Sequence, residues 1–188
     1  MDVHVSEDRS VSEDKPVSED KPLPYLTGYA PRIVEQVRQL LADEKLGPWL
    51  LERYPRCHGL GNERALYAYA VELKNRHMRQ APALQKVVYD PKLHVLHNAL
   101  GIHKRTSRIH GSRLSTRNEI RIATVFRKAP QAFLDMILVH ELAHLRELDH
   151  NRAFYQLCRH MLPDYEQLEL DARLYLTYKE CVGELYEA

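Results

Sequence analysis

The feature that most constrains the fold is an apolar run that leads directly into two histidines. Residues 133–139 hold six apolar side chains and one aspartate, and the chain continues with His140, Glu141 and, three residues later, His144. A helix that is apolar on nearly every side must be surrounded by the rest of the protein. Side chains four residues apart emerge from the same face of a helix, one turn apart. The sequence therefore predicts a core helix over residues 131–148 with two imidazoles on one face.

His140, Glu141 and His144 form the pattern His-Glu-x-x-His, which is typical of a catalytic metal site. The two imidazoles would bind one divalent cation, with zinc as the first choice for such ligands. Glu141 would activate water as the general base and pass its proton to the leaving group. The alternative is a chance occurrence of a short pattern on a charged helix, where both histidines would be ordinary side chains.

A catalytic site needs a third protein ligand, and His150 is the best candidate. It lies six residues past the second histidine, in a segment that resembles a break between two helices, where the chain can turn back. Glu147 is the rival because it would share a helix face with His140. However, seven residues of straight helix span about 10 Å, which is too far for a compact tetrahedral site. We therefore predict His140, His144 and His150 as the ligands.

The order of the predicted elements indicates an α+β fold. Apolar periodicity predicts helices in four further segments, which are residues 31–45, 65–78, 152–161 and 164–186. Between the second helix and the motif helix, short β-prone runs at residues 87–89, 93–96 and 119–125 predict a small antiparallel sheet. The 119–125 strand could hold an extended peptide if it lies at the sheet edge, and it would be inaccessible as an inner strand.

Residues 1–22 differ in composition from the rest of the chain. They contain an imperfect VSEDKP repeat, with seven acidic and three basic residues, and too few apolar side chains to offset the entropy of ordering. We expect a disordered tail over residues 1–22 and one domain over residues 23–188. The formal net charge of the whole chain is +1, too small by itself to indicate nucleic-acid binding.

The cysteines and the overall hydropathy pattern bear on localisation. The three cysteines show no CxxC spacing, and the chain starts without an apolar secretory segment. No stretch reaches the roughly 20 uncharged apolar residues needed to cross a bilayer. The expectation is a cytoplasmic protein without a membrane partner.

Several of these segments together resemble a known family. The stretch from Asn118 to Leu174 contains NEIRIATVF, FLDMILVHELAHL and HNRAFYQLC in that order, and it is similar to the YgjP-like (SprT-related) metal-dependent hydrolases. The resemblance implies a minimal zincin-like fold, with a small sheet packed on the motif helix and helices flanking it. It also implies zinc ligands at His140, His144 and His150, with Glu141 as general base.

Two substrate classes follow from these observations. A zincin site suggests a metallopeptidase that cleaves protein or peptide. The resemblance also implies a nucleoside triphosphate pyrophosphatase, converting UTP to UMP and diphosphate. Eight basic residues between His103 and Lys128, against the single acid Glu119, would suit phosphate oxygens. Arg108, Arg113 and Arg121 are the predicted substrate contacts, although a solvated basic face explains them as well.

A third hypothesis is that the protein is a nucleic-acid-binding module and not an enzyme. The basic segment would dock on nucleic acid while the metal only stabilises the fold. Structural zinc sites are usually closed by four protein ligands, frequently cysteines, and no cysteine lies close to the motif in sequence except Cys158. The metal-dependent hydrolase is therefore preferred.

Overall fold

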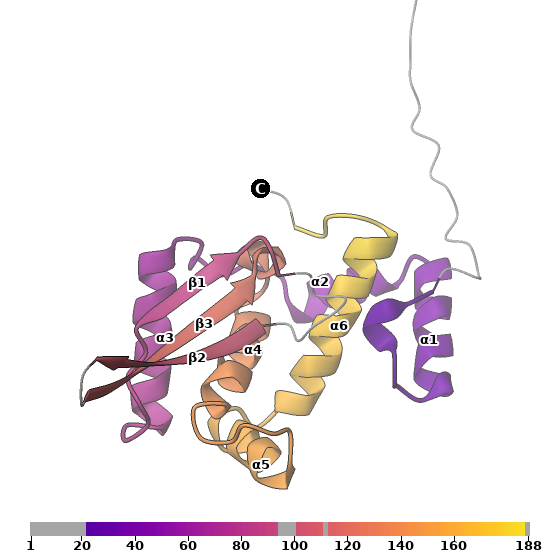
Figure 1. Cartoon of the computed structure of the whole chain (residues 1–188). Helices are drawn as coiled ribbons and strands as arrows, with labels where there is room; N and C mark the ends of the chain where they lie inside the picture. The colour runs from indigo at the N-terminus through magenta and orange to yellow at the C-terminus, as the bar shows by residue number, and fades with distance from the viewer. Residues whose placement is uncertain (1–21, 94–100, 111–112, 187–188) are drawn as a thin grey trace, which may run out of the picture.

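The computed structural model describes residues 22–93, 101–110 and 113–186, without the side chains of residues 101–110 and 113–117. A three-stranded sheet lies beside a group of helices (Figure 1). Helix α3 contacts β1, α4 contacts β2, and α6 packs on α4, on α2 and on the N-terminal turn η1. The described elements are η1 (Pro24–Leu26), α1 (Pro31–Ala42), α2 (Leu46–Arg53), α3 (Glu63–His77), β1 (Lys86–Asp90), β2 (Gly101–His110), β3 (Arg113–Ala123), η2 (Thr124–Lys128), α4 (Gln131–Ala143), α5 (Arg152–Met161) and α6 (Tyr165–Cys181). The predicted α+β plan, with a small sheet packed on the motif helix, is confirmed.

The sheet is mixed, and the prediction of a purely antiparallel sheet is wrong in this detail. The strand order is β1-β3-β2, with β3 antiparallel to β2 and parallel to β1. Ile120 and Ile122 of β3 are fully buried in the core. A strand with apolar residues of this kind gains most by lying between two neighbours. The segment 119–125, considered above as a possible edge strand, therefore belongs to the central strand and the turn after it.

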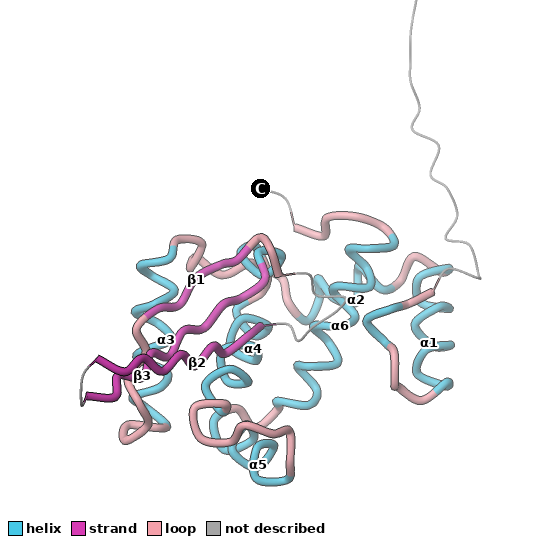
Figure 2. The backbone as a smooth tube through the Cα atoms, viewed as in Figure 1, coloured by secondary structure: helices cyan, strands magenta, loops and turns pink. Residues whose placement is uncertain are grey.

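The β2–β3 pair is longer than the rest of the sheet. Strand β1 pairs only with residues 119–123, whereas β2 pairs with β3 back to Arg113. Figure 2 shows this hairpin extending past β1 and past the helices behind it. Strand β2 is not among the predicted strands, because its run GIHKRTSRIH lacks the apolar alternation of a half-buried strand.

Helix α4 is the centre of the core, as its composition predicts. Nine of its side chains are buried, and they include residues on every side of the helix: Phe133, Leu134, Met136, Ile137, Leu138, Val139, Glu141, Leu142 and Ala143. The helix also contacts β2, α5 and α6. A helix enclosed in this way holds its side chains in fixed positions, which a precise site requires.

Several helix boundaries differ from the predictions, most of all the C-terminal ends of α4 and α6. Helix α4 ends at Ala143 with His144 as its C-cap, rather than continuing to Leu148, because the chain tightens there into turns in which the Leu145 N–H donates to the Leu142 carbonyl. Helix α2 is absent from the predicted helices, and Gly47-Pro48 lies in its first turn. Proline is tolerated there because the first backbone N–H groups of a helix have no intrahelical acceptor.

Some predictions fall on residues outside the description. These are most of the β-prone run at residues 93–96 and nearly all of the predicted tail at residues 1–22. The division into a tail and one domain thus stays a prediction. Among the described residues, no helix is both long and apolar enough to cross a membrane.

Candidate metal centre

Three imidazoles form a nearly equilateral triangle where α4 ends and α5 begins. The ring centroids of His140, His144 and His150 are 4.8 to 5.0 Å apart. One nitrogen from each ring lies within 4.8 Å of the others. The Nε2 atoms of His140 and His150 are 3.1 Å apart. Two nitrogens bound to one tetrahedral zinc at about 2.05 Å would be about 3.3 Å apart. The geometry therefore fits a single cation of this size.

Local structure explains why His150 lies next to His140 and His144. After α4 the chain turns, and Asn151 accepts a hydrogen bond from the Phe154 backbone N–H at 3.0 Å, which makes Asn151 the N-cap of α5. Capping by asparagine fixes where a helix starts. His150 directly precedes this cap, so the start of α5 positions its imidazole. The predicted break between helices at this point is confirmed.

Phe154 forms the floor of the imidazole triangle. It is fully buried, and its ring centroid lies 5.0 Å from that of His140, 4.7 Å from that of His144 and 4.7 Å from that of His150. One apolar ring thus contacts all three imidazoles and excludes water from below. Phe154 is not among the predicted site residues, although its spacing of four residues from His150 would place it one helical turn away.

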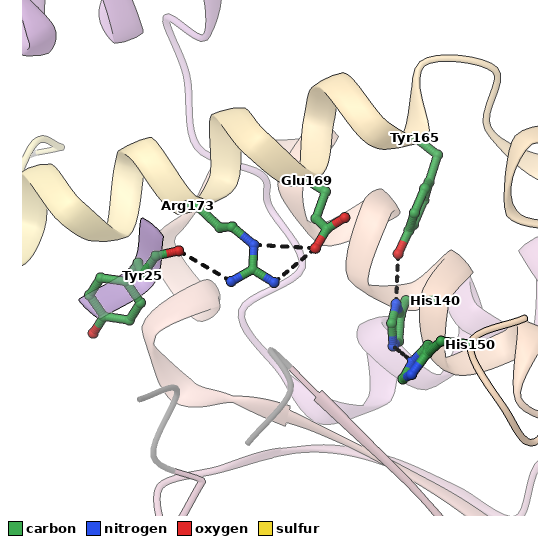
Figure 3. A network of polar contacts seen from close by, with 6 residues as sticks. All are labelled: Tyr25, His140, His150, Tyr165, Glu169 and Arg173. Carbon is green, nitrogen blue, oxygen red and sulfur yellow. Dashed lines mark hydrogen bonds and ion pairs between the residues drawn. The ribbon is translucent and has the colours of Figure 1, made fainter. Parts of the chain in front are cut away.

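Two of the histidines are oriented through their Nδ1 atoms. Nδ1 of His140 lies 2.6 Å from the hydroxyl oxygen of Tyr165, and Nδ1 of His144 lies 2.9 Å from the Glu147 carbonyl oxygen. Hydrogen bonds at Nδ1 fix the ring and leave Nε2 for a cation, as in other metal centres. Figure 3 shows Tyr165 above His140, with His150 on the opposite side of that ring. Glu147, considered above as a rival ligand, contributes its backbone carbonyl instead.

The environment favours neutral imidazoles, which are the form that binds metal. Burial, followed by the neighbouring charges of His144 and His150, lowers the pKa of His140 to about 3. Burial is also the main cause that lowers the pKa of His144. Both rings therefore have a nitrogen lone pair available at neutral pH.

Glu141 lies within the core and beside the triangle. Its side chain is only 1% exposed, although it follows His140 directly on α4. Burial raises the pKa of the Tyr165 hydroxyl well above its ordinary value, and the charges of Glu169 and, to a lesser degree, Glu141 add to this effect. The Glu141 carboxylate is therefore close to the group that orients His140, and its role as general base stays a prediction.

One face of α6 continues the site away from the triangle. Tyr165, Glu169 and Arg173 point to the same side of this helix (Figure 3). Arg173 donates from Nη2 to Oε1 of Glu169 at 2.8 Å, and the positive charge of Arg173 is among the causes that lower the pKa of His140. The ring centroid of Tyr155 lies 6.4 Å from that of His150 and 6.4 Å from that of Tyr165.

The predicted substrate contacts are located on the sheet. Arg121 lies on β3 and forms ion pairs with Asp90 and Glu119, each at 2.7 Å, so two carboxylates compensate its charge. Arg108 and Arg113 belong to the part of the β2–β3 hairpin that extends beyond β1. Their side chains lie outside the described part of the structure. All three stay predictions as substrate contacts.

Comparisons with known proteins identify the family. Residues 63–173 match the family model described as YgjP-like, metallopeptidase domain, and this range includes all of the triangle. The chain is 54% identical over 155 residues to a protein of Escherichia coli (strain K12) named UTP pyrophosphatase, covering 82% of this chain and 93% of that protein. No solved structure matches the chain significantly. The chain belongs to the YgjP-like family and is a metal-dependent hydrolase.

Proposed function

We propose that the protein is a nucleoside triphosphate pyrophosphatase that hydrolyses UTP to UMP and diphosphate at a zinc ion held by His140, His144 and His150. The similarity to the Escherichia coli UTP pyrophosphatase supports the substrate, since it extends over 82% of this chain. The observation that carries the site is the imidazole triangle, with centroids 4.8 to 5.0 Å apart over the floor of Phe154. Three protein ligands leave a fourth position open for substrate or water, as in catalytic zinc sites.

Each residue of the centre has a role in this proposal. When bound, zinc supplies Lewis-acid polarisation of a phosphoryl oxygen and lowers the pKa of water. Glu141 takes a proton from the attacking water and delivers it to the departing diphosphate. Water attacks the α-phosphorus, and the bond from that phosphorus to the bridging oxygen breaks. Tyr165 accepts a hydrogen bond from Nδ1 of His140 and so keeps Nε2 toward the cation.

Arg108 and Arg113 remain proposed contacts to the triphosphate. Guanidinium groups bind phosphate oxygens in pairs, and both residues lie on paired positions of one hairpin, opposite Ser115 and His110 respectively. Arg121 is the weaker candidate of the three because Asp90 and Glu119 already compensate its charge. Binding of phosphate by Arg121 would first require it to leave these carboxylates.

Peptide hydrolysis is the second candidate, because the matching family model is described as a metallopeptidase domain. In the described sheet β2 is an edge strand, and it also contacts α4, the motif helix. An extended peptide could pair with the free edge of β2 by strand addition and so lie near the imidazoles. The same Glu141 would serve as base in this reaction.

The nucleic-acid-binding module receives no such support. It would need a closed structural zinc site, and among the described residues the three histidines are the one group identified that could hold a metal. Cys158 is fully buried on α5 and is not part of this group. A reducing cytoplasmic compartment remains part of the proposal, and the absence of a disulfide at the exposed Cys57 and the buried Cys158 fits it.

The test compares zinc-loaded wild type with Glu141→Gln on a panel of nucleoside triphosphates and on an unfolded protein. We expect diphosphate release from UTP by the wild type, reduced by about two to four orders of magnitude in Glu141→Gln while zinc content is unchanged. Glu72→Gln, a change at an exposed position on α3, is the control and should behave as wild type. Cleavage of protein without diphosphate release would support the peptidase instead. Inactivity of the zinc-loaded wild type on every substrate would contradict both.

A further inference from the structure

The α6 face next to the metal centre carries an ion pair between Glu169 and Arg173. Tyr165, Glu169 and Arg173 follow one another at four-residue intervals, so they lie along one face of the helix (Figure 3). Tyr165 contacts His140 directly. With a rise of 1.5 Å per residue, Glu169 lies about 6 Å and Arg173 about 12 Å along the helix from Tyr165. This row leads from the metal centre over a distance comparable to the span of one nucleoside.

The geometry of the pair fixes a donor and an acceptor side by side. Arg173 donates from Nε at 3.2 Å and from Nη2 at 2.8 Å to the same oxygen, Oε1 of Glu169. Its Nη1 donates to the Tyr25 carbonyl oxygen at 3.3 Å. Within the described contacts, Oε2 of Glu169 receives no hydrogen bond, and Figure 3 shows it on the side away from Arg173. A guanidinium has five N–H groups, so Arg173 also keeps donors for a ligand.

Tyrosine rings surround this pair. The guanidinium carbon of Arg173 lies 5.9 Å from the ring centroid of Tyr29. The ring of Tyr155 lies 6.4 Å from that of His150, and burial followed by the charge of Glu169 raises its pKa, so Tyr155 neighbours both the triangle and the pair. Both rings are partly exposed. Aromatic side chains in such positions offer faces on which a nucleobase can stack.

The charges of the pair favour a neutral ligand group over a phosphate. The Glu169 carboxylate compensates the positive charge of Arg173 and would repel a phosphate oxygen placed next to it. A nucleobase edge is uncharged and presents donors and acceptors in a fixed order. Uracil has an imino N–H beside a carbonyl, and guanine has the same arrangement. Cytosine and adenine carry an unprotonated ring nitrogen beside an amino group.

We infer that Glu169 and Arg173 bind the base of the nucleotide, with Glu169 accepting the imino N–H and Arg173 donating to the adjacent carbonyl. The inference rests on the proposed nucleotide substrate and names the part of the site that selects its base. Uracil is preferred over cytosine, and guanine over adenine, because the disfavoured base would present a lone pair to the Glu169 carboxylate. A polar site that must leave one of its groups unmatched discriminates strongly against the wrong ligand.

Equilibrium binding of nucleoside monophosphates to the zinc-loaded, full-length protein tests this assignment. Calorimetric titrations give the dissociation constants of UMP, CMP, GMP and AMP. Two ratios are compared, CMP to UMP and AMP to GMP, each between two bases of the same size. The wild type should bind UMP about tenfold or more tightly than CMP, and GMP likewise over AMP. In Glu169→Gln both ratios should fall several-fold, because an amide can turn either a donor or an acceptor toward the base, while Arg173 still favours a carbonyl.

The matched control is Glu72→Gln. Glu72 and Arg76 on α3 form the same kind of pair four residues apart, with Nη2 and Oε1 separated by 2.7 Å. This variant should keep both ratios at the wild-type value. Because each ratio is taken within one protein preparation, a partly misfolded sample lowers both affinities alike and leaves the ratio unchanged.

The outcomes separate this inference from the proposed function. Equal binding of UMP and CMP by the wild type, or a preference that Glu169→Gln leaves unchanged, overturns the base site. Diphosphate release from UTP, measured in the same preparations, decides the hydrolytic activity independently. A base preference that Glu169→Gln reduces several-fold would thus support the base site even if no diphosphate were released.

Discussion

The hydroxyl oxygen of Tyr165 lies 2.6 Å from Nδ1 of His140, although the two residues are 25 positions apart in the chain. Tyr165 is the first residue of α6, and His140 is near the end of α4. The packing of α6 on α4 therefore determines the orientation of one imidazole of the metal centre. This relationship links the position of a whole helix to the affinity for a cation.

Removing this hydroxyl should weaken metal binding. Tyr165→Phe keeps the buried ring but deletes the hydrogen-bond partner of His140, and losses of such partners typically reduce metal affinity by about 10- to 100-fold. Competition with a zinc-binding dye measures the change. Tyr69→Phe is the control, because its hydroxyl also lies 2.6 Å from a polar atom, Oδ1 of Asp135, outside the centre. Equal zinc affinities of Tyr165→Phe and the control would contradict the orienting role.

Loss of the α5 N-cap should affect both stability and zinc. Asn151→Ala removes the acceptor for the Phe154 N–H and should cost about 1 kcal/mol of unfolding free energy. Because His150 directly precedes the cap, zinc affinity should fall as well. Asn62→Ala on α3 removes an equivalent cap, in which the Ala65 N–H donates to Asn62 at 2.8 Å. It should lower stability by a similar amount and leave zinc affinity unchanged, as chemical denaturation and dye competition would show.

Truncating Phe154 should disturb all three ligands at once. Phe154→Leu leaves a gap beneath the triangle, and we expect a loss of about 1 to 3 kcal/mol of stability, somewhat less than complete truncation to alanine. Phe126→Leu makes the same change at another fully buried position, on η2. Both variants should unfold at lower denaturant concentration. Only Phe154→Leu should also lower zinc affinity; an equal effect of the two on zinc would argue against a specific floor.

Removal of the metal should leave the fold intact. The core is formed by apolar side chains such as Leu138, Leu142 and Tyr175, all buried and none part of the triangle. Treatment with a chelator should therefore preserve far-ultraviolet circular dichroism while abolishing hydrolysis. The melting temperature should rise again with added zinc, corresponding to about 4 kcal/mol at 1,000 times the dissociation constant. An unfolded apo protein would instead indicate a structural metal.

The sequence predicts the metal triangle well because its information is local. His140, His144 and His150 are close in the chain, and helix periodicity and one break bring them together. The contact of Tyr165 with His140 could not be predicted in this way, because it depends on how α6 packs on α4. The parallel pairing of β1 with β3 was missed for the same reason: the order of strands in a sheet depends on contacts between distant segments. Arg121 shows the converse, because its paired carboxylates cannot be found from a count of basic residues.

The proposed metal ligands and the proposed base-binding residues belong to different helices, and this bears on how the range of substrates can change. The imidazoles and Glu141 belong to α4, its C-cap and the residue before the N-cap of α5, whereas Glu169 and Arg173 belong to α6. Substitutions of Glu169 or Arg173 can thus alter which nucleotide binds. They leave the proposed metal ligands and Glu141 in place. A library randomised at positions 169 and 173 would explore new substrates while His140, His144, His150 and Glu141 are all retained. Substrate specificity in such a fold can therefore change by single substitutions, each of which retains the three histidines of the metal centre.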